Sequence, residues 1–245
     1  MYLVPRTIRT IAILFLLAVG IGLYRVKHVP TPRVTAPLTR YHGYALNRQA
    51  IKRAKVFTVL ISNEGFEQKS RGTGMLIDST HVLTAAHMIP DNGNEMWVYI
   101  FPGRRIVHAK PVLVDSAHDL AILEIDEKVI IPHYATFQEA HYDGEPITII
   151  GNILGGMQWY VSYGIISGDW DGYLLMDGTM THGDSGGPWI NEKGEVVGLS
   201  DWVLSDTGPE SAVKGGVSAK NINALLKRWK APNIRDILQM LIGGN

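Results

Sequence analysis

The chain has 245 residues, of which 46% are hydrophobic and none is cysteine. This length can bury a sizeable core, and the lack of cysteine excludes disulfides and a lipid-modified cysteine. The formal net charge is zero, but residues 1–63 contain ten Lys or Arg and no acid, so the remainder carries a net charge of −10 and is a poor candidate for binding nucleic acid.

An apolar run from Thr10 to Tyr24 follows two arginines near the N-terminus. Because the run is apolar on every face, a buried helix of a soluble protein is a poor interpretation. At about 1.5 Å per residue it reaches ~25 Å, a marginal length for crossing a bilayer. The core of a signal peptide has a similar length, and Gly20-x-Gly22 is an acceptable small-x-small cleavage site. We favour a membrane anchor within residues 1–26, with a removed signal as the alternative.

The flanking charges leave the orientation of this segment open. More cations follow it than precede it, namely Arg25, Lys27, Arg33 and Arg40 against Arg6 and Arg9. The positive-inside rule would therefore keep the folded domain in the cytoplasm. A short tail before a lone hydrophobic segment, however, more often stays inside while the following domain is exported. We expect the domain outside the cytoplasm, membrane-anchored or secreted, with a cytoplasmic-facing membrane protein as the alternative.

Residues 27–54 are predicted to form a basic, proline-containing linker, with a short helix over Asn47–Ala54. From residue 55 the pattern becomes rich in β-strands separated by turn residues. A first set is expected at 56–62, 74–77, 81–85, 96–101, 106–114 and 120–125. A second set is expected at 146–150, 160–167, 173–176, 188–190, 196–200 and 212–218. The sequence therefore predicts an all-β domain of two antiparallel six-stranded β-barrels, the first over about residues 55–132 and the second over about 145–218.

Beyond the barrels the apolar period changes from two residues to 3.6. A helix is expected over Ser218–Trp229, which completes a folded domain over residues 55–230. Pro232 can begin a further helix within residues 231–245. We expect its apolar stripe to pack against the body of the protein rather than against a partner or a membrane.

The stretch Thr181–Pro188, Thr-His-Gly-Asp-Ser-Gly-Gly-Pro, places Ser185 among glycines. Glycine adopts the dihedrals that expose a serine hydroxyl and aim backbone N–H groups at one point, where they can stabilise an oxyanion. The hydroxyl also needs a histidine base and a carboxylate that orients the base. The pattern Gly-x-Ser-x-Gly occurs in α/β-hydrolases too, but there the base follows the serine, and the last histidine of this chain is His182.

A histidine and a carboxylate in suitable settings precede the serine. His87 ends the apolar segment Val82–His87, and Asp119 opens the segment Asp119–Asp126, which resembles a buried strand. A carboxylate at the start of such a strand can accept the Nδ1 proton of a histidine and fix its tautomer. The chain order His, Asp, Ser is therefore available for nucleophilic catalysis.

Three motifs in this order resemble those of the trypsin-like (chymotrypsin-fold) serine peptidases. They are Thr84-Ala-Ala-His87, Asp119-Leu-Ala-Ile-Leu123 and Gly183-Asp-Ser-Gly-Gly-Pro188. The segment Arg71-Gly-Thr-Gly-Met-Leu-Ile77 strengthens the similarity to bacterial members, including HtrA-type domains, here without a PDZ domain. The resemblance covers roughly Lys55 to Trp229 and implies a chymotrypsin-like double barrel.

The resemblance also implies an activity. It identifies His87, Asp119 and Ser185 as the catalytic triad of a serine endopeptidase, with an oxyanion hole formed by the N–H groups of Gly183 and Ser185. A protein or peptide substrate would lie in the cleft between the barrels. No metal or other cofactor is indicated, because the chain has no Cys/His cluster with zinc spacing. Two alternatives stay open: a catalytically silent, membrane-tethered binding module, and a viral or phage processing protease.

Substrate-binding positions follow from the same resemblance. Thr179, six residues before the serine, matches the base of the primary pocket. The strand Gly198–Trp202 is expected to pair with the substrate backbone, and either Ser200 or Asp201 lies beside the catalytic acid. Gly216 and the glycine before it are expected to leave one wall of the pocket open. These positions favour a neutral, small-to-medium substrate side chain.

Asp184 differs in its expected partner from the matching acid of the animal relatives. There the acid pairs with a new N-terminus that cleavage releases, but no such sequence precedes Val56 here. Activation by that route is not expected, so Asp184 needs another cation or hydrogen-bond donor.

Overall fold

The computed structural model describes residues 48–62, 71–90, 96–101, 103–152, 159–204 and 213–231. The predicted N-terminal anchor or signal, most of the predicted linker and the predicted helix that begins at Pro232 lie outside these residues. Within the described part of the chain, no helix is long and apolar enough to cross a bilayer.

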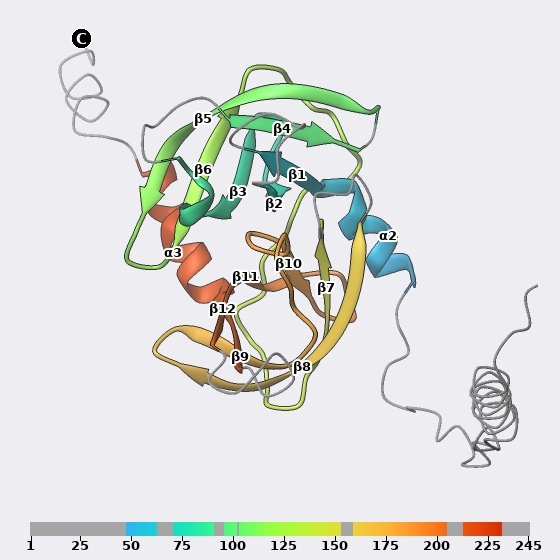
Figure 1. Cartoon of the computed structure of the whole chain (residues 1–245), viewed down its shortest axis with the longest axis vertical. Coiled ribbons are helices and arrows are strands. Elements are labelled where there is room, and N and C mark those ends of the chain that lie inside the picture. Colours follow the sequence, from blue (N-terminus) through green and yellow to red (C-terminus); the bar gives the residue numbers. More distant parts are fainter. Residues whose placement is uncertain are drawn as a thin grey trace, which may run out of the picture. The chain divides into compact units, whose positions relative to one another are not determined.

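Strands β1 to β6 form a closed antiparallel barrel in the order β1-β2-β3-β6-β5-β4 (Figure 1). Their bounds are β1 Thr58–Ser62, β2 Arg71–Leu76, β3 His81–Ala85, β4 Met96–Ile100, β5 Arg105–Asp115 and β6 Leu120–Ile125. Helix α2 (Arg48–Phe57) leads directly into β1, and a short 3₁₀ turn, η1 (Ala86–Met88), follows β3. This turn contains His87.

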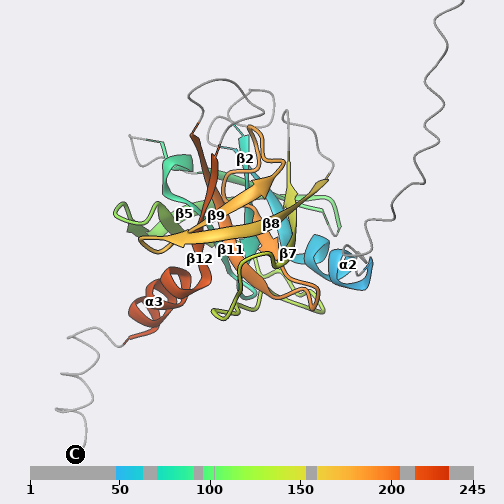
Figure 2. The same cartoon turned by 90° about the horizontal axis from the view of Figure 1, so that it is seen from below.

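Strands β7 to β12 form a second closed antiparallel barrel in the order β10-β11-β12-β9-β8-β7. Their bounds are β7 Pro146–Gly151, β8 Tyr160–Trp170, β9 Tyr173–Gly178, β10 Pro188–Ile190, β11 Val196–Leu204 and β12 Val213–Ser218, and helix α3 (Ala219–Lys230) follows β12. Figures 1 and 2 place α2 and α3 on opposite sides of the two barrels. The serine turn immediately precedes β10, so it belongs to the second barrel.

The predicted double barrel is confirmed, and each predicted run overlaps a strand. The main differences concern length, because β8 continues to Trp170 and β11 to Leu204, beyond their predicted ends. Both strands contain an irregular step in register, between Ile166 and Gly168 in β8 and between Ser200 and Trp202 in β11. A bulge inserts one extra residue and interrupts the alternation of buried and exposed side chains. The sequence pattern therefore predicts the end of a strand at the bulge, although the strand continues beyond it.

A shared apolar core joins the two barrels. One buried cluster fills the first barrel and continues through Leu199 and Val217 of the second barrel to Ile222 and Leu225 of α3. The remaining buried cluster surrounds Trp189, which is fully buried. Because the larger cluster crosses from one barrel to the other, the core fixes η1 relative to the serine turn.

Candidate active site

His87 lies in η1, just after β3 ends. The turn is held by Asp119, the last residue of the β5–β6 connection: the Ala86 N–H donates to the Asp119 carbonyl oxygen at 3.0 Å, and the His87 N–H donates to Asp119 Oδ1 at 2.8 Å. Met88 on the other side is buried and anchors the turn in the core. The imidazole itself is 46% exposed, so a substrate can reach it.

Asp119 directly precedes β6 and has a left-handed backbone, with φ of +50°. Aspartate tolerates this conformation better than most residues with a Cβ. Its Oδ2 lies 2.5 Å from His87 Nδ1, which assigns the proton of a neutral imidazole to Nδ1 and leaves Nε2 as an acceptor. Partial burial acts to raise the pKa of Asp119, but hydrogen bonds from His87 and Asp201 hold it below its ordinary value.

The pKa of His87 is raised above its ordinary value, chiefly by the hydrogen bond to Asp119, against the opposing effect of partial burial. The negative charge of Asp119 adds to the increase. A more basic imidazole accepts a proton more readily, and the bound carboxylate stabilises the imidazolium that results. The His87–Asp119 pair therefore has the geometry and the electrostatics of an oriented general base.

The serine turn is docked against β2 and the end of β3. The Thr73 N–H donates to the Ser185 carbonyl oxygen at 2.8 Å, and Thr73 Oγ1 donates to the Gly183 carbonyl oxygen at 2.7 Å. A Cβ placed on Gly186 would lie 3.1 Å from the backbone nitrogen of Ala85, two residues before His87. The turn can approach this closely because Gly186 has no side chain and has φ of +81°.

The backbone N–H groups of the turn divide into two sets. Those of Asp184, Gly186 and Gly187 donate to the carbonyl oxygens of Thr181, Ser200 and Asp184, respectively. Among the hydrogen bonds of the described residues, the N–H groups of Gly183 and Ser185 have no acceptor. Gly183 has φ of +101°, which supports this arrangement of peptide planes. Two unpaired N–H groups beside a serine hydroxyl are suited to binding an anion.

Ser185 is half-buried, and the structure records no hydrogen bond between its hydroxyl and the His87 ring. The backbone contacts of the turn nevertheless place the serine next to the end of β3, from which the histidine emerges. In enzymes without a bound substrate such hydrogen bonds are often long and tighten only in the complex. The structure thus forms the predicted His87–Asp119 contact and packs the serine turn against the end of β3, and it records no hydrogen bond between Ser185 and His87.

The sequence left open whether Ser200 or Asp201 lies beside the predicted catalytic acid, Asp119, and the structure places Asp201 there. In β11, Ser200 pairs with Gly216 and Trp202 pairs with Gly215, so Asp201 is the bulged residue between them. Its Oδ1 lies 4.0 Å from His87 Nδ1, and its side chain is 8% exposed. Ser200 is fully buried and accepts a 2.8 Å hydrogen bond from the Trp189 indole N–H.

Asp184 is fully buried on the other side of the serine turn. The Thr181 N–H donates to its Oδ2 at 2.8 Å, so a backbone donor is one partner of this acid. Its Oδ1 packs against Gly151, where any Cβ would collide with it, and that oxygen has no hydrogen-bond partner among the described residues. Burial raises the pKa of Asp184 to about 6.

The positions of the predicted substrate-binding residues Thr179 and Gly216 do not by themselves define a substrate pocket. Thr179 is exposed just after β9, where its carbonyl oxygen accepts a 2.8 Å hydrogen bond from the Ser162 hydroxyl. Gly216 differs from the expectation of an open wall, because a Cβ there would meet the buried Trp189 ring. At Gly215, a Cβ would collide with the indole of Trp202.

Sequence reasoning missed Thr73 and Asn152, two residues that support the turn from behind. Thr73 Oγ1 accepts hydrogen bonds from the Asn152 N–H at 3.0 Å and from Asn152 Nδ2 at 3.1 Å, while it donates to Gly183. Asn152 Nδ2 also donates to the Val59 carbonyl oxygen at 3.1 Å. The available signal was a threonine between two glycines in the segment that carried the HtrA-type resemblance.

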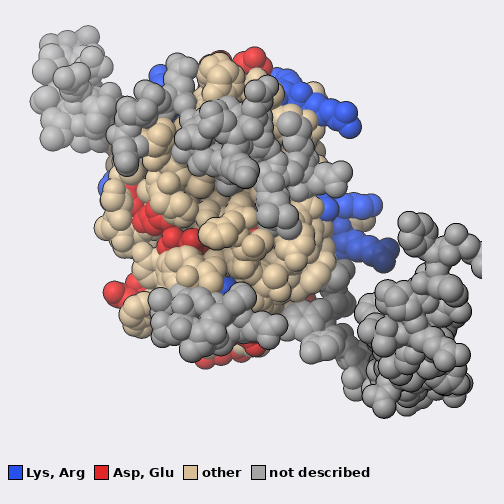
Figure 3. Space-filling model, in the orientation of Figure 1, with Lys and Arg blue, Asp and Glu red and all other residues tan. Residues whose placement is uncertain are grey.

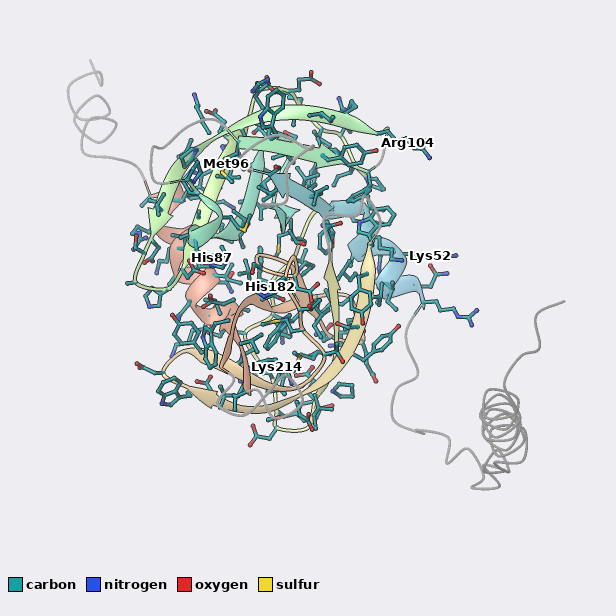
Figure 4. The ribbon with its side chains drawn as sticks, in the orientation of Figure 1. Lys52, His87, Met96, Arg104, His182 and Lys214 are labelled. Atoms are coloured by element: carbon teal, nitrogen blue, oxygen red, sulfur yellow. The ribbon has the colours of Figure 1, made fainter. Side chains whose placement is uncertain are left out.

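The surroundings of the site are acidic. Figure 3 shows carboxylates gathered toward the left of this face, the part of the view in which Figure 4 labels His87. His87, Asp119 and Asp201 are the described residues whose ring nitrogen and carboxylate oxygens all lie within 4.8 Å of one another. The His87 ring is already hydrogen-bonded to Asp119, so we interpret this cluster as a histidine–carboxylate pair with a neighbouring acid rather than as a cation site.

Comparisons with known proteins agree with the fold. Residues 72–199 match the family model described as a trypsin-like peptidase domain. A probable periplasmic serine endoprotease of DegP-like type from Rhizobium meliloti is 31% identical over 174 residues, which are 65% of this chain and 34% of that protein. The Do-like serine protease HtrB of Bacillus subtilis is 33% identical over 150 residues, 55% of this chain and 32% of its own length.

A solved structure gives the same result. The crystal structure of the serine endoprotease from Yersinia pestis superposes with a TM-score of 0.65 at 25% identity, covering 74% of this chain and 65% of that one. The expected resemblance to trypsin-like peptidases of HtrA type is confirmed. The chain spans about a third of the length of the curated relatives it matches.

Proposed function

We propose that this chain, which belongs to the trypsin-like peptidase family, is a serine endopeptidase that hydrolyses peptide bonds through an acyl-enzyme. The observation that carries the proposal is the His87–Asp119 hydrogen bond of 2.5 Å beside a serine turn that packs against the end of β3. The relatives named as serine endoproteases support the same activity.

In the proposed mechanism, His87 Nε2 accepts the proton of the Ser185 hydroxyl as Oγ bonds to the substrate carbonyl carbon. Asp119 stabilises the imidazolium and keeps the ring in the required orientation. The tetrahedral intermediate then breaks its C–N bond, and the leaving amine takes the proton from His87. A water molecule, deprotonated by His87, attacks the acyl-enzyme and releases the acid and free Ser185.

The N–H groups of Gly183 and Ser185 would bind the oxyanion, because the other amides of the turn that donate already have acceptors. Loss of one such donor typically costs about 3 kcal/mol of transition-state stabilisation. Thr73 supports this role, since its hydroxyl donates to the Gly183 carbonyl oxygen and so helps to fix the orientation of the backbone at Gly183.

The substrate backbone would add to the free edge of β11. Strand β10 pairs with β11 as far as Leu199, whereas beyond the bulge the one described strand that pairs with β11 is β12, through Trp202, Val203 and Leu204. An extended peptide can take the vacant edge by β-addition. Thr179, just after β9, is exposed and uncharged, which fits a neutral, small-to-medium substrate side chain.

We place the peptidase domain at residues 55–230, after a membrane anchor or signal at 1–26 and a linker at 27–54. The periplasmic names of the relatives favour a site of action outside the cytoplasm, either anchored or secreted. The partners are then protein or peptide substrates, and contact with the membrane depends on the N-terminal segment.

The test is labelling of the full chain by a fluorophosphonate, followed by hydrolysis of fluorescent casein. Ser185→Ala should abolish labelling and lower hydrolysis by at least about 10⁴-fold while the fold is retained. Ser167→Ala, on the exposed face of β8, is the matched control and should label normally. Unchanged hydrolysis in Ser185→Ala contradicts the assignment, and an unlabelled, inactive wild-type chain favours a silent binding module.

A further inference from the structure

Asp201 is the residue of β11 that the bulge leaves without a cross-strand partner. Bulges beside active sites commonly redirect a side chain, and this one directs the Asp201 carboxyl group to the His87–Asp119 pair. Asp201 Oδ1 lies 4.0 Å from His87 Nδ1, and a carboxylate oxygen of Asp201 lies within 4.8 Å of one of Asp119. The Asp201 side chain is almost fully buried.

Two carboxyl groups this close together cannot both be ionised at low cost, so one of them holds a proton. Asp119 accepts hydrogen bonds from the His87 backbone N–H and from the His87 ring, both of which favour its ionised form. Among the described residues, no N–H group donates a hydrogen bond to the Asp201 carboxyl group, and the Asp201 side chain is only 8% exposed to solvent. The proton therefore resides on Asp201.

Building on the proposed peptidase function, we propose that Asp201 is a positioning residue that stays protonated while the enzyme works and donates a hydrogen bond from its carboxyl group to the Asp119 carboxylate. Asp201 does not contact substrate. It orients Asp119, which in turn orients the His87 ring. During turnover the proton that His87 accepts and returns comes from Ser185, and the Asp201 proton stays in place.

The arrangement has an alkaline limit. Burial, followed by the hydrogen bond and the charge of Asp119, raises the pKa of Asp201 to about 8. Above this pH the bond between the two carboxyl groups is replaced by repulsion between two carboxylates. Asp119 then loses its orientation, and activity should fall as the pH rises through about 8.

Other ionisable groups near Asp201 do not produce this limit. Burial and the charges of nearby carboxylates, including Asp201, raise the pKa of Tyr173 in β9 above its ordinary value, so Tyr173 stays neutral near pH 8. Lys214 of β12 is aligned with Val203 rather than with Asp201. On α3, Arg228 is paired with Asp115 at 3.0 Å. His87 and Asp119 are thus the groups that directly face Asp201.

The first experiment measures the rate of fluorophosphonate labelling of the full chain from pH 6 to 10, in EDTA. Wild type should lose roughly tenfold per pH unit above about pH 8. Asp201→Asn, whose amide is a hydrogen-bond donor without a titrating proton, should keep its rate through pH 9. Asp201→Ala should be slower than Asp201→Asn by roughly tenfold at every pH, because the donor is missing. Asp143→Asn, at an exposed turn, is the control and should reproduce the wild-type profile.

A second experiment measures the titration of Asp201 directly, without relying on catalytic activity. In the Ser185→Ala chain with ¹³C-labelled aspartate carboxyl groups, one resonance should titrate near pH 8 by NMR and should vanish when Asp201→Asn or Asp201→Ser is added. If no aspartate titrates there, or if the wild-type and Asp201→Asn profiles coincide up to pH 10, the inference is wrong. Labelling that survives Ser185→Ala would instead overturn the peptidase function on which the inference rests.

Discussion

Replacing Asp184 with asparagine should change how stability depends on pH. The acid is fully buried and its pKa is raised from an ordinary 3.8 to about 6, first of all by desolvation. The folded chain therefore binds more protons than the unfolded chain between about pH 4 and pH 6. With this sign, the contribution of Asp184 to the free energy of unfolding decreases as the pH rises through that window and stays low above it.

The magnitude follows from the two pKa values. Their difference corresponds to about 3 kcal/mol of unfolding free energy, at about 1.36 kcal/mol per pH unit. Asparagine keeps an oxygen that can accept the Thr181 N–H, and it carries no charge to desolvate. Asp184→Asn should match wild type near pH 4 and exceed its unfolding free energy by up to about 3 kcal/mol at pH 7.

The assay is urea unfolding of the full chain at pH 4, 5, 6 and 7, followed by tryptophan fluorescence. Ser185→Ala in every sample prevents self-digestion, and Asp143→Asn serves as an exposed control of the same chemistry. The informative quantity is the difference between the Asp184→Asn and parent curves, since other acids titrate equally in both. A difference that is flat across pH, or that falls as the pH rises, would refute the argument from desolvation.

Two further predictions concern buried hydrogen bonds. Thr73→Val removes the donor to the Gly183 carbonyl oxygen and the acceptor for Asn152, so the free energy of unfolding should fall by about 2–4 kcal/mol and fluorophosphonate labelling should slow; a variant as stable as wild type contradicts this. Trp189→Phe removes the indole N–H that bonds to the buried Ser200 hydroxyl, which should cost about 1–3 kcal/mol in the same urea assay, whereas no loss would mean that water replaces the donor.

The strands could be predicted from the sequence because their apolar periodicity is local and their turns contain the expected residues. The turn Asn191–Gly194 is one example: Gly194 has φ of +82°, and the Asn191 side chain accepts from the N–H groups of Lys193 and Glu195. The two ends of β11 show the limit of this reasoning. Its pairing with β10 follows an ordinary pattern, but the bulge at Asp201 depends on how many residues the partner strand β12 supplies.

The support of the serine turn could not be predicted for a related reason. Thr73 and Gly183 are 110 residues apart, and Thr73 and Asn152 are 79 residues apart, yet their hydrogen bonds meet at one hydroxyl. No local propensity encodes such contacts, because they appear only when two barrels have closed and packed against each other. The motif around Ser185 identified the turn, whereas the side chains that hold it belong to two other strands or their ends.

Asp184 and Asp201 show why residue type alone does not determine the role of an acid. Both are buried beside the serine and histidine, and desolvation raises the pKa of both. Asp184 has a backbone donor and no carboxylate neighbour that contributes to its shift, so it ionises near pH 6 and should affect mainly stability. Asp201 faces the Asp119 carboxylate, so it keeps its proton to about pH 8 and should affect mainly activity. Because the two windows are separated, a change in stability below pH 6 and a loss of labelling above pH 8 can be assigned to different carboxyl groups within one set of variants.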